Sequence, residues 1–225
     1  MIVDKTGAKG TGAMTIKEAA ERGIAAGTIG AALDARFLSA LKAERVAASA
    51  VLRGPEAGAS PLVVDKAALV ADVRAALYVA KICSYAQGMN LIREAARANG
   101  WSVDLGECAR IWKGGCIIRA VFLDRIKQAY EKNPALANLL VDPDFAAEVN
   151  DRQGAWRRVV SLCVASGIAC PAFSASLGYF DQYRRARLPA NLTQAQRDFF
   201  GAHTFERVDR PAGEWVHCVW DPSAK

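Results

Sequence analysis

The sequence predicts an all-α protein, and three observations support that prediction. Apolar residues recur at helical spacing along most of the chain, strand-like alternation is nearly absent, and the prolines fall between the predicted helices. The 225 residues are 52% hydrophobic and 23% charged, which is ordinary for a globular protein and excludes a disordered or fibrous chain. We expect one multi-helix domain over residues 1–225, with the loop at residues 54–61 as the one candidate boundary.

The first predicted helices are bounded by capping residues and glycines. Thr15 and Glu18 have capping-box spacing and Gly23 supplies a stop, so a short helix is expected between them. A longer helix is expected from Thr28, as its cap, to about Leu52. Its apolar face repeats every four residues, at Ile29, Leu33, Phe37 and Leu41.

The longest predicted helix runs from Lys66 to about Asn99, between Asp65 and Gly100. Its apolar residues cover more than one face, so it should run through the core. Further helices are expected at Asp104–Trp112, Cys116–Lys132, Asp144–Ser166, Ala172–Arg187 and Thr193–Phe200, and a short extended stretch at Glu214–Trp220.

Composition argues against several classes of function. The net charge of +6 is scattered among acidic residues without a basic arm, so a nucleic-acid binder is the least favoured reading. Six cysteines and two histidines lack metal-ligand spacing, so we expect no metal site and free thiols in a reducing compartment. The start of the chain lacks a signal peptide, and Pro171 interrupts the uncharged stretch Val159–Phe180. The first feature predicts a cytoplasmic chain. The second predicts two buried helices within residues 159–180 rather than a membrane span.

Two candidates for binding an anion lie near the N-terminus. Lys9 is set in a glycine-rich stretch at residues 7–12, where backbone N–H groups can approach a ligand, although a flexible turn is the simpler interpretation. Arg36 falls at the edge of the predicted buried face. It either pairs with an acidic neighbour or points into a cavity for an anion, and the residues alone favour the ion pair.

Two more candidates lie near the C-terminus. Arg197 is on the last predicted helix and His203 follows its glycine stop, a combination that suits a phosphate with neighbouring hydroxyls. The alternative is a helix that packs Phe199 and Phe200 and leaves Arg197 in solvent. Composition does not separate the two, and no serine-hydrolase elbow or zinc-protease motif is present.

Five stretches of the chain occur in an order that is characteristic of one family. They are KGTG at 9–12, SYAQG at 84–88, WKGGCIIR at 112–119, WRR at 156–158 and LPANLTQAQRDFFGAHT at 188–204. With these motifs the chain resembles the C-terminal half of decarboxylating 6-phosphogluconate dehydrogenases, from about residue 2 to Trp220.

The resemblance implies a helical domain without the Rossmann half, which assembles as a homodimer and contacts 6-phosphogluconate. The contacting residues would be Lys9 and Arg36 of one subunit with Arg197 and His203 of the other. The family oxidises its substrate at C3 by hydride transfer to NADP or NAD, then decarboxylates it and protonates the enediol to give ribulose 5-phosphate. Its catalytic lysine and glutamate precede the KGTG motif. We therefore assign no catalytic residue here and expect the chain to be inactive alone, with a separate dinucleotide-binding chain as a candidate partner.

Two departures from the family pattern affect these expectations. Ala13-Met14 replaces the usual Lys-Trp after KGTG, and the chain stops soon after Trp220, so cofactor contacts made by longer tails are in question. The rival reading is a non-enzymatic helical dimerisation module that keeps the family core. The four matched residues favour a retained ligand site over that module.

Overall fold

The computed structural model describes residues 1–7, 9–55 and 65–220. Contacts between residues divide the chain into two compact units, Met1–Phe180 and Asp181–Lys225, called unit 1 and unit 2 below. The prediction of a single domain over residues 1–225 stays a prediction, because compactness alone does not measure independent folding.

Helices make up most of unit 1, a helix is the longest regular element of unit 2, and the only strands described are two short ones, which confirms the all-α class. The described elements are α1 (Gly12–Glu21), α2 (Gly27–Ala40), α3 (Lys42–Ser49), α4 (Lys66–Asn99), α5 (Leu105–Ile111), α6 (Phe122–Lys132), the 3-10 helix η1 (Leu139–Val141), α7 (Pro143–Ala165), α8 (Pro171–Tyr183), α9 (Ala190–Gly201), β1 (Phe205–Glu206) and β2 (Trp215–Val216). The two short strands form one antiparallel pair, with Phe205 opposite Val216.

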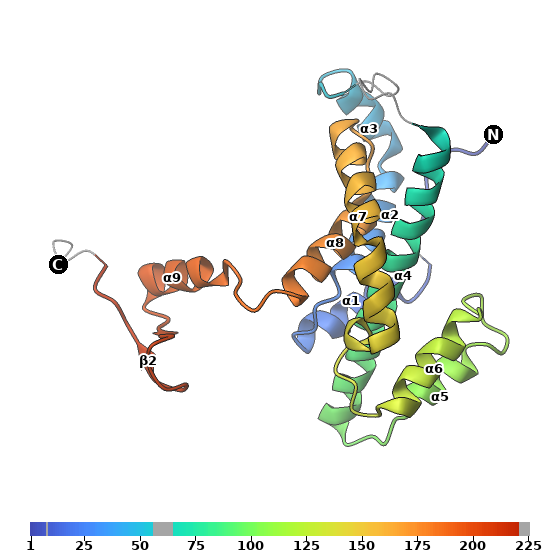
Figure 1. Ribbon diagram of the computed structural model, residues 1–225. Coiled ribbons are helices and arrows are strands. Elements are labelled where there is room, and N and C mark those ends of the chain that lie inside the picture. Colours follow the sequence, from blue (N-terminus) through green and yellow to red (C-terminus); the bar gives the residue numbers. More distant parts are fainter. Residues whose placement is uncertain (8, 56–64, 221–225) are drawn as a thin grey trace. The chain divides into compact units, whose positions relative to one another are not determined.

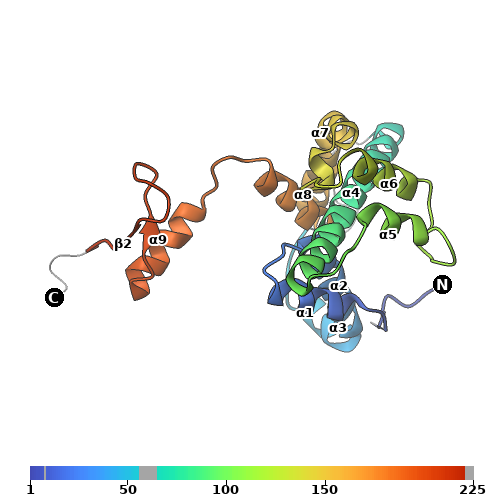
Figure 2. The ribbon, with the colours of Figure 1, turned by 90° about the horizontal axis from the view of Figure 1, so that it is seen from below.

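Helix α4 forms the axis of unit 1, as the sequence predicts. The Asp65 carboxylate accepts from the Ala67 amide at 2.8 Å and so caps the helix, and Gly100 ends it with φ of 65°. Helix α7 packs along α4 (Figure 1), and α1 to α3 lie on the opposite side of α4 from α7 (Figure 2). The long helix therefore runs through the core.

The core of unit 1 consists of large apolar side chains from α4, α6, α7 and η1. The largest that are fully buried are Trp156, Phe145, Ile82, Met89, Leu123, Ile126 and Leu139. A buried polar network joins α2, α4 and α8 beside this core. Gln87 donates from Nε2 to the Thr28 hydroxyl at 2.9 Å, and that hydroxyl lies 2.9 Å from the Ser176 Oγ.

The first two helices differ from their predicted bounds. Helix α1 begins at Gly12, and the Thr15 hydroxyl donates to the Thr11 carbonyl at 3.0 Å, so Thr15 is inside the helix and does not cap it. The helix expected from Thr28 to Leu52 is broken at Leu41 into α2 and α3. Thr28 does not cap α2, because Gln87 binds its amide and hydroxyl in the interior.

Part of the predicted apolar face of α2 is also wrong. Ile29 and Leu33 are half-buried, but Phe37 is 48% and Leu41 is 47% exposed. Helical spacing places residues on one face without saying how far the neighbouring elements extend to cover it. Along this face of α2, the neighbouring elements bury no apolar side chain after Leu33.

The bounds of the later helices also differ from those predicted. Helix α6 begins at Phe122, and residues 116–121 form turns in which Ile117 is 96% and Val121 is 79% exposed. Apolar side chains that reach no core add nothing to helix stability, and β-branched residues disfavour a helix. Helix α8 ends at Tyr183 rather than Arg187, and α9 extends from Ala190 to Gly201.

The stretch that the sequence predicts as two buried helices is helical but only partly buried, since Val164 is 68% and Ile168 is 56% exposed. The stretch Val159–Phe180 falls in α7 and α8, separated by a turn at residues 166–170. Among the described residues, no helix is long and apolar enough to cross a membrane. The extended stretch at Glu214–Trp220 contains β2, whereas the sequence pattern does not predict the paired strand β1. Most of the loop predicted at residues 54–61 lies outside the described residues.

Candidate functional site

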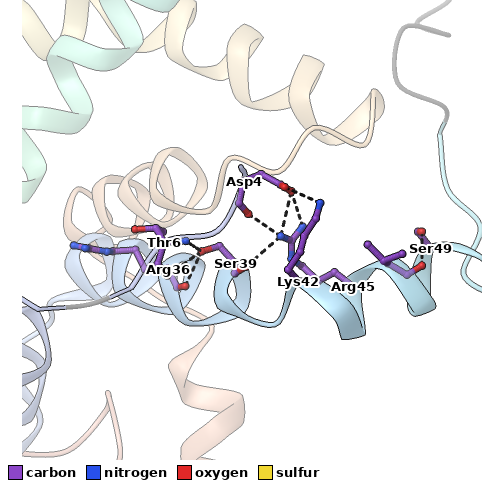
Figure 3. A network of polar contacts seen from close by, with 8 residues as sticks. Asp4, Thr6, Arg36, Ser39, Lys42, Arg45 and Ser49 are labelled. Carbon is purple, nitrogen blue, oxygen red and sulfur yellow. Dashed lines mark hydrogen bonds and ion pairs between the residues drawn. The ribbon is translucent and has the colours of Figure 1, made fainter. Parts of the chain in front are cut away.

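The N-terminal segment at residues 4–7 lies along α2 and contacts Arg36, one of the four predicted residues (Figure 3). The Arg36 guanidinium donates from Nε to the Gly7 carbonyl oxygen at 3.1 Å, and its Nη2 donates to the same oxygen. Further along α2, the Ser39 hydroxyl oxygen accepts from the Thr6 amide at 3.1 Å. Arg36 therefore fixes the chain at Gly7, which lies two residues before Lys9 in the sequence.

An ion-pair clamp fixes the start of the same segment. The Asp4 carboxylate lies 2.6 Å from Lys42 Nζ and 3.1 Å from Arg45 Nη1, and Arg45 also donates to the Asp4 carbonyl at 2.8 Å. Hydrogen bonds from Lys42 and then Arg45 lower the pKa of Asp4 to about 2. Asp4 is exposed and both cations are partly exposed, so these ion pairs contribute little to overall stability. Their effect is to set the path of residues 4–7 over α2.

Arg36 takes neither of the two arrangements that the sequence left open. Its side chain is exposed, and among the described residues no carboxylate forms an ion pair with it, so the favoured ion pair is wrong. The guanidinium carries five N–H donors. The Gly7 carbonyl oxygen accepts hydrogen bonds from two of its nitrogens, Nε and Nη2. The remaining donors stay available to an anion that approaches the exposed side.

Lys9 stands just before a helix N-terminus. Its side chain is exposed, and α1 begins three residues later at Gly12. No described side chain caps that helix, so the amides of its first turn remain unpaired donors with a partial positive charge. A lysine that immediately precedes a helix N-terminus is a combination that favours an anion.

The other two predicted residues lie at the end of α9 in unit 2. Arg197 is exposed and donates from Nη1 to the Gln194 side-chain oxygen at 3.1 Å. His203 follows the helix end, where Ala202 adopts a left-handed φ of 50°. A Cβ on Gly201 would lie 2.9 Å from His203 Nε2, so the imidazole folds back against this glycine. The missing side chain at position 201 makes room for the ring.

Asp198 organises the backbone around these two residues, and the sequence interpretation missed it. The carboxylate is fully buried. It accepts hydrogen bonds from the amide of Thr204 at 2.8 Å, His217 Nδ1 at 3.0 Å, the amide of Cys218 at 3.1 Å and Trp220 Nε1 at 2.9 Å. Burial alone raises the pKa of Asp198, but these hydrogen bonds lower it by more, so the group is a carboxylate at neutral pH.

A sequence signal for Asp198 exists in retrospect. An acidic residue stands among aromatic ones in the motif at residues 196–203, and buried carboxylates need several donors. Those donors come from residues up to 22 positions later in the chain. Spacing alone does not reveal that the tail folds back to them.

The four predicted residues therefore divide between the two units. Lys9 and Arg36 belong to unit 1, where Arg36 contacts Gly7. Arg197 and His203 belong to the end of α9 in unit 2, on either side of the glycine that accommodates the imidazole. Phe200, which the alternative interpretation packs inside, is 81% exposed.

Unit 1 also contains a cavity of about 760 Å³ between α2, α4 and α8, which includes none of the four residues. Apolar side chains such as Val73, Leu77 and Phe173 form most of its wall. Lys81 lies on its lining with Nζ 4.4 Å from the centre of the Phe122 ring, and burial followed by repulsion from Arg125 lowers its pKa. Within the described ranges, no three metal-binding side chains are grouped closely enough to hold an ion.

Comparison with known proteins gives a consistent result across the chain. The sequence profile of the family described as "6-phosphogluconate dehydrogenase, C-terminal domain" matches residues 1–220. The chain is 63% identical to "6-phosphogluconate dehydrogenase, decarboxylating 1" of Oryza sativa subsp. japonica, over 97% of this chain and 45% of that protein. It is 56% identical to "6-phosphogluconate dehydrogenase, decarboxylating" of Synechococcus elongatus, over 98% and 46% respectively.

A solved structure gives the same result. The Plasmodium falciparum 6-phosphogluconate dehydrogenase, studied in its apo form and in complex with NADP⁺ and with 6-phosphogluconate, superposes with a TM-score of 0.92 at 44% identity. The match covers 98% of this chain and 46% of that one. The chain thus spans less than half the length of the relatives that it matches.

Proposed function

Because the chain belongs to the family of 6-phosphogluconate dehydrogenase C-terminal domains, we propose that it forms the substrate-binding and dimerisation portion of a decarboxylating 6-phosphogluconate dehydrogenase. The whole enzyme would convert 6-phosphogluconate and NADP to ribulose 5-phosphate and CO₂. The observation that best supports a retained ligand site is the pair of hydrogen bonds from Arg36 to the Gly7 carbonyl, which fixes the exposed Arg36 guanidinium against the chain two residues before Lys9.

The proposed substrate is a phosphorylated sugar acid, which carries two anionic groups. In the proposed site, Lys9 and Arg36 of one subunit and Arg197 and His203 of its partner bind these anions. Arginine suits phosphate because its planar fork donates two parallel hydrogen bonds, and histidine adds a donor that can also serve neighbouring hydroxyls. The role of this chain is then to bind and orient the substrate.

The proposed hydride acceptor is NADP, because NADP⁺ is the cofactor with which the Plasmodium protein forms a complex. The described residues do not fit a dinucleotide site, because their one sheet has two short antiparallel strands and no glycine-rich turn between a strand and a helix. We therefore assign none of them to the nicotinamide and derive no step through it.

Self-association is the second part of the proposal. On α4, Val70 and Leu77 are each 60% exposed and Val73 is 39% exposed, at spacings that place them on one face. An apolar face of this kind is typical of a contact between subunits.

Sedimentation should detect a dimer, and Leu77→Glu should weaken it. Val121→Glu, a matched change at an exposed apolar residue outside α4, should not. A monomeric parent protein at micromolar concentration would contradict the proposal.

We also place the protein in a reducing compartment such as the cytoplasm. All six cysteines are free in the structure, which is the expected state of thiols there. The names of some plant relatives specify the chloroplast.

Thermal unfolding with 6-phosphogluconate tests the ligand site. At a ligand concentration of 100 times Kd, binding should stabilise the protein by about 2.7 kcal/mol, and high salt should reduce the effect. Arg36→Ala and Arg197→Ala should each abolish most of the shift. Arg187→Ala, an exposed arginine of unit 2 outside the matched motifs, should retain it. Equal loss in all three variants would show diffuse surface charge and favour the dimerisation module without a ligand site.

Mixing the two binding-deficient variants tests whether the site is shared between subunits. A heterodimer of Arg36→Ala and Arg197→Ala has one site with both arginines removed and one site with both intact. Random exchange should then restore about a quarter of the parental binding capacity, since half of the dimers are mixed and each has one working site of two. No restoration after subunit exchange would mean that both arginines act within one chain.

A further inference from the structure

One face of α9 receives the chain that follows the helix. Gln194, Asp198 and Gly201 lie on this face, because residues spaced by four and then three positions stack along one side of a helix. Asp198 binds the amide of Thr204, and the missing side chain at Gly201 makes room for the His203 imidazole. Gln194, which is half-buried on the same face, is the member of this set that the binding site does not yet explain.

The side-chain amide of Gln194 makes two hydrogen bonds at once. Its oxygen Oε1 accepts from Arg197 Nη1 at 3.1 Å, and its nitrogen Nε2 donates to the Thr204 carbonyl oxygen at 2.6 Å. A guanidinium can only donate and a carbonyl can only accept, so these two partners determine which way the amide points. Gln194 therefore links Arg197 to the residue that directly follows His203.

The backbone on both sides of His203 is strained. Ala202 has a left-handed φ of 50° and Thr204 has one of 60°, a conformation that residues other than glycine rarely adopt and that is least suited to a β-branched residue. Strain of this kind persists only where the surrounding contacts hold it. Here Asp198 accepts from the Thr204 amide at 2.8 Å, and Gln194 donates to the Thr204 carbonyl. Both backbone polar groups of Thr204 are thus held by side chains of α9.

We propose that Gln194 is a positioning residue of the anion site, which sets the Arg197 guanidinium and the backbone of His203 relative to one another. This inference rests on the proposed function, in which Arg197 and His203 bind 6-phosphogluconate, and it gives Gln194 no contact with the ligand. Among the described residues, Gln194 is the one whose side chain bonds both Arg197 and Thr204. Asp198 holds the same loop but has no hydrogen bond to Arg197 within the described ranges.

The link increases affinity by restricting the ligand-binding groups before the ligand arrives. Arg197 is exposed, and an unrestrained arginine side chain samples many rotamers. The hydrogen bond from Nη1 to Gln194 narrows that range and leaves the other N–H groups available to an anion. Less conformational entropy is then lost on binding. The hydrogen bond to the Thr204 carbonyl has the same effect on the backbone of His203.

The affinity of the full chain for 6-phosphogluconate, measured by isothermal titration calorimetry, provides the first test. Gln194→Met keeps a side chain of similar length but removes both hydrogen bonds. It should raise Kd about tenfold, the effect of losing one hydrogen bond to a charged group. Gln196→Met is the matched control, because Gln196 is exposed in the same motif and bonds no described residue, and it should bind like the parent. Parental affinity in Gln194→Met would overturn the proposal.

A double-mutant cycle separates positioning from a merely structural role. Arg197→Lys keeps the positive charge but removes the Nη1 atom that Gln194 binds. If Gln194 acts through Arg197, Gln194→Met should raise Kd much less in the Arg197→Lys background than in the parent. A merely structural residue would give the same fold-loss in both backgrounds, and that result would overturn the proposal.

A ligand-free measurement distinguishes failure of this inference from failure of the proposed function. Without ligand, the Thr204 amide should exchange with solvent faster in Gln194→Met than in the parent or in Gln196→Met. If the parent does not bind 6-phosphogluconate, the proposed function fails, but unchanged exchange at Thr204 is what shows that Gln194 does not hold the loop.

A second variant keeps the test valid if Gln194→Met folds poorly. Gln194→Glu has nearly the same shape but cannot donate to the Thr204 carbonyl, and its negative charge competes with the ligand for Arg197. It should therefore bind 6-phosphogluconate more weakly than Gln194→Met does, and high salt should reduce the difference. Parental affinity in Gln194→Glu would overturn the proposal.

Discussion

Units 1 and 2 of this chain are held together by different interactions. Unit 1 buries large apolar side chains such as Trp156, Phe145 and Ile82 in one core. In the described part of unit 2, the one fully buried side chain is the carboxylate of Asp198. Hydrophobic burial scales with area and tolerates a change of pH, whereas a buried carboxylate is stable only while its donors remain in place. The two units should therefore unfold under different conditions.

The largest effect is expected for Trp156→Ala in unit 1. The side chain is fully buried, and its ring centre lies 6.0 Å from that of Phe180. Removing it should cost about 3–5 kcal/mol of the free energy of unfolding, as measured by urea denaturation of the helical signal. Trp156→Phe should cost less, because among the described residues the indole Nε1 has no hydrogen-bond partner to lose. An equal loss of unfolding free energy in both variants would show that the indole N–H, and not the burial of the ring, accounts for the stabilisation.

Asp198→Ala should have the second largest effect, confined to unit 2. Without the carboxylate, the amides of Thr204 and Cys218 lose their acceptor, so both should exchange faster with solvent. Amides in α4 and α7 should keep their protection. The control is Asp209→Ala, which removes an exposed carboxylate that pairs with Arg207 at 2.6 Å. Faster exchange throughout unit 1 would show that the two units are not held independently.

Acid titration should separate the units by mechanism. The pKa of Asp198 is lowered in the folded protein, so its contribution to stability is complete above the unfolded value of about 3.9. That contribution is lost only as the pH falls through the lower folded value. The indole N–H signal of Trp220 should therefore survive acidification through about pH 4 and disappear only in stronger acid, as the pH approaches the lowered folded pKa of Asp198. Asp198→Asn, which does not titrate, should remove this loss of the Trp220 signal in acid. If the loss is unchanged, another titrating group causes it.

The same contrast explains which elements the sequence predicts well. Helix α4 has a capping aspartate, a terminal glycine and apolar residues on several faces, all of which are local signals, and the structure confirms its predicted bounds. For helix α6 the sequence predicts a start at Cys116, which would place Ile117 and Val121 inside the helix. The structure exposes both, and only tertiary packing determines that.

The candidate site is predictable only in part for a related reason. Residue type identifies Arg36 and Arg197 as cations that suit an anion, but not what fixes them in place. Arg36 binds a backbone carbonyl, which has no sequence signature. Asp198 depends on donors from a tail that begins almost 20 residues later, and residue spacing carries no information about such a contact.

The smallest effect on stability, but a clear effect on binding, is expected for Gly201→Ala. Alanine stabilises a helical position by about 0.5–1 kcal/mol relative to glycine. The new Cβ would lie 2.9 Å from His203 Nε2, so the imidazole must rotate away, which is cheap for an exposed side chain. These two effects oppose each other, and the melting temperature should hardly change.

If His203 binds the ligand in the position seen here, the Gly201→Ala variant should nevertheless lose affinity for 6-phosphogluconate. Gly178→Ala, at a helical glycine of α8 with open space around it, is the matched control and should keep that affinity. Unchanged binding in Gly201→Ala would show that the position of the imidazole over Gly201 does not matter for the site, and His203 would then be removed from the proposed ligands.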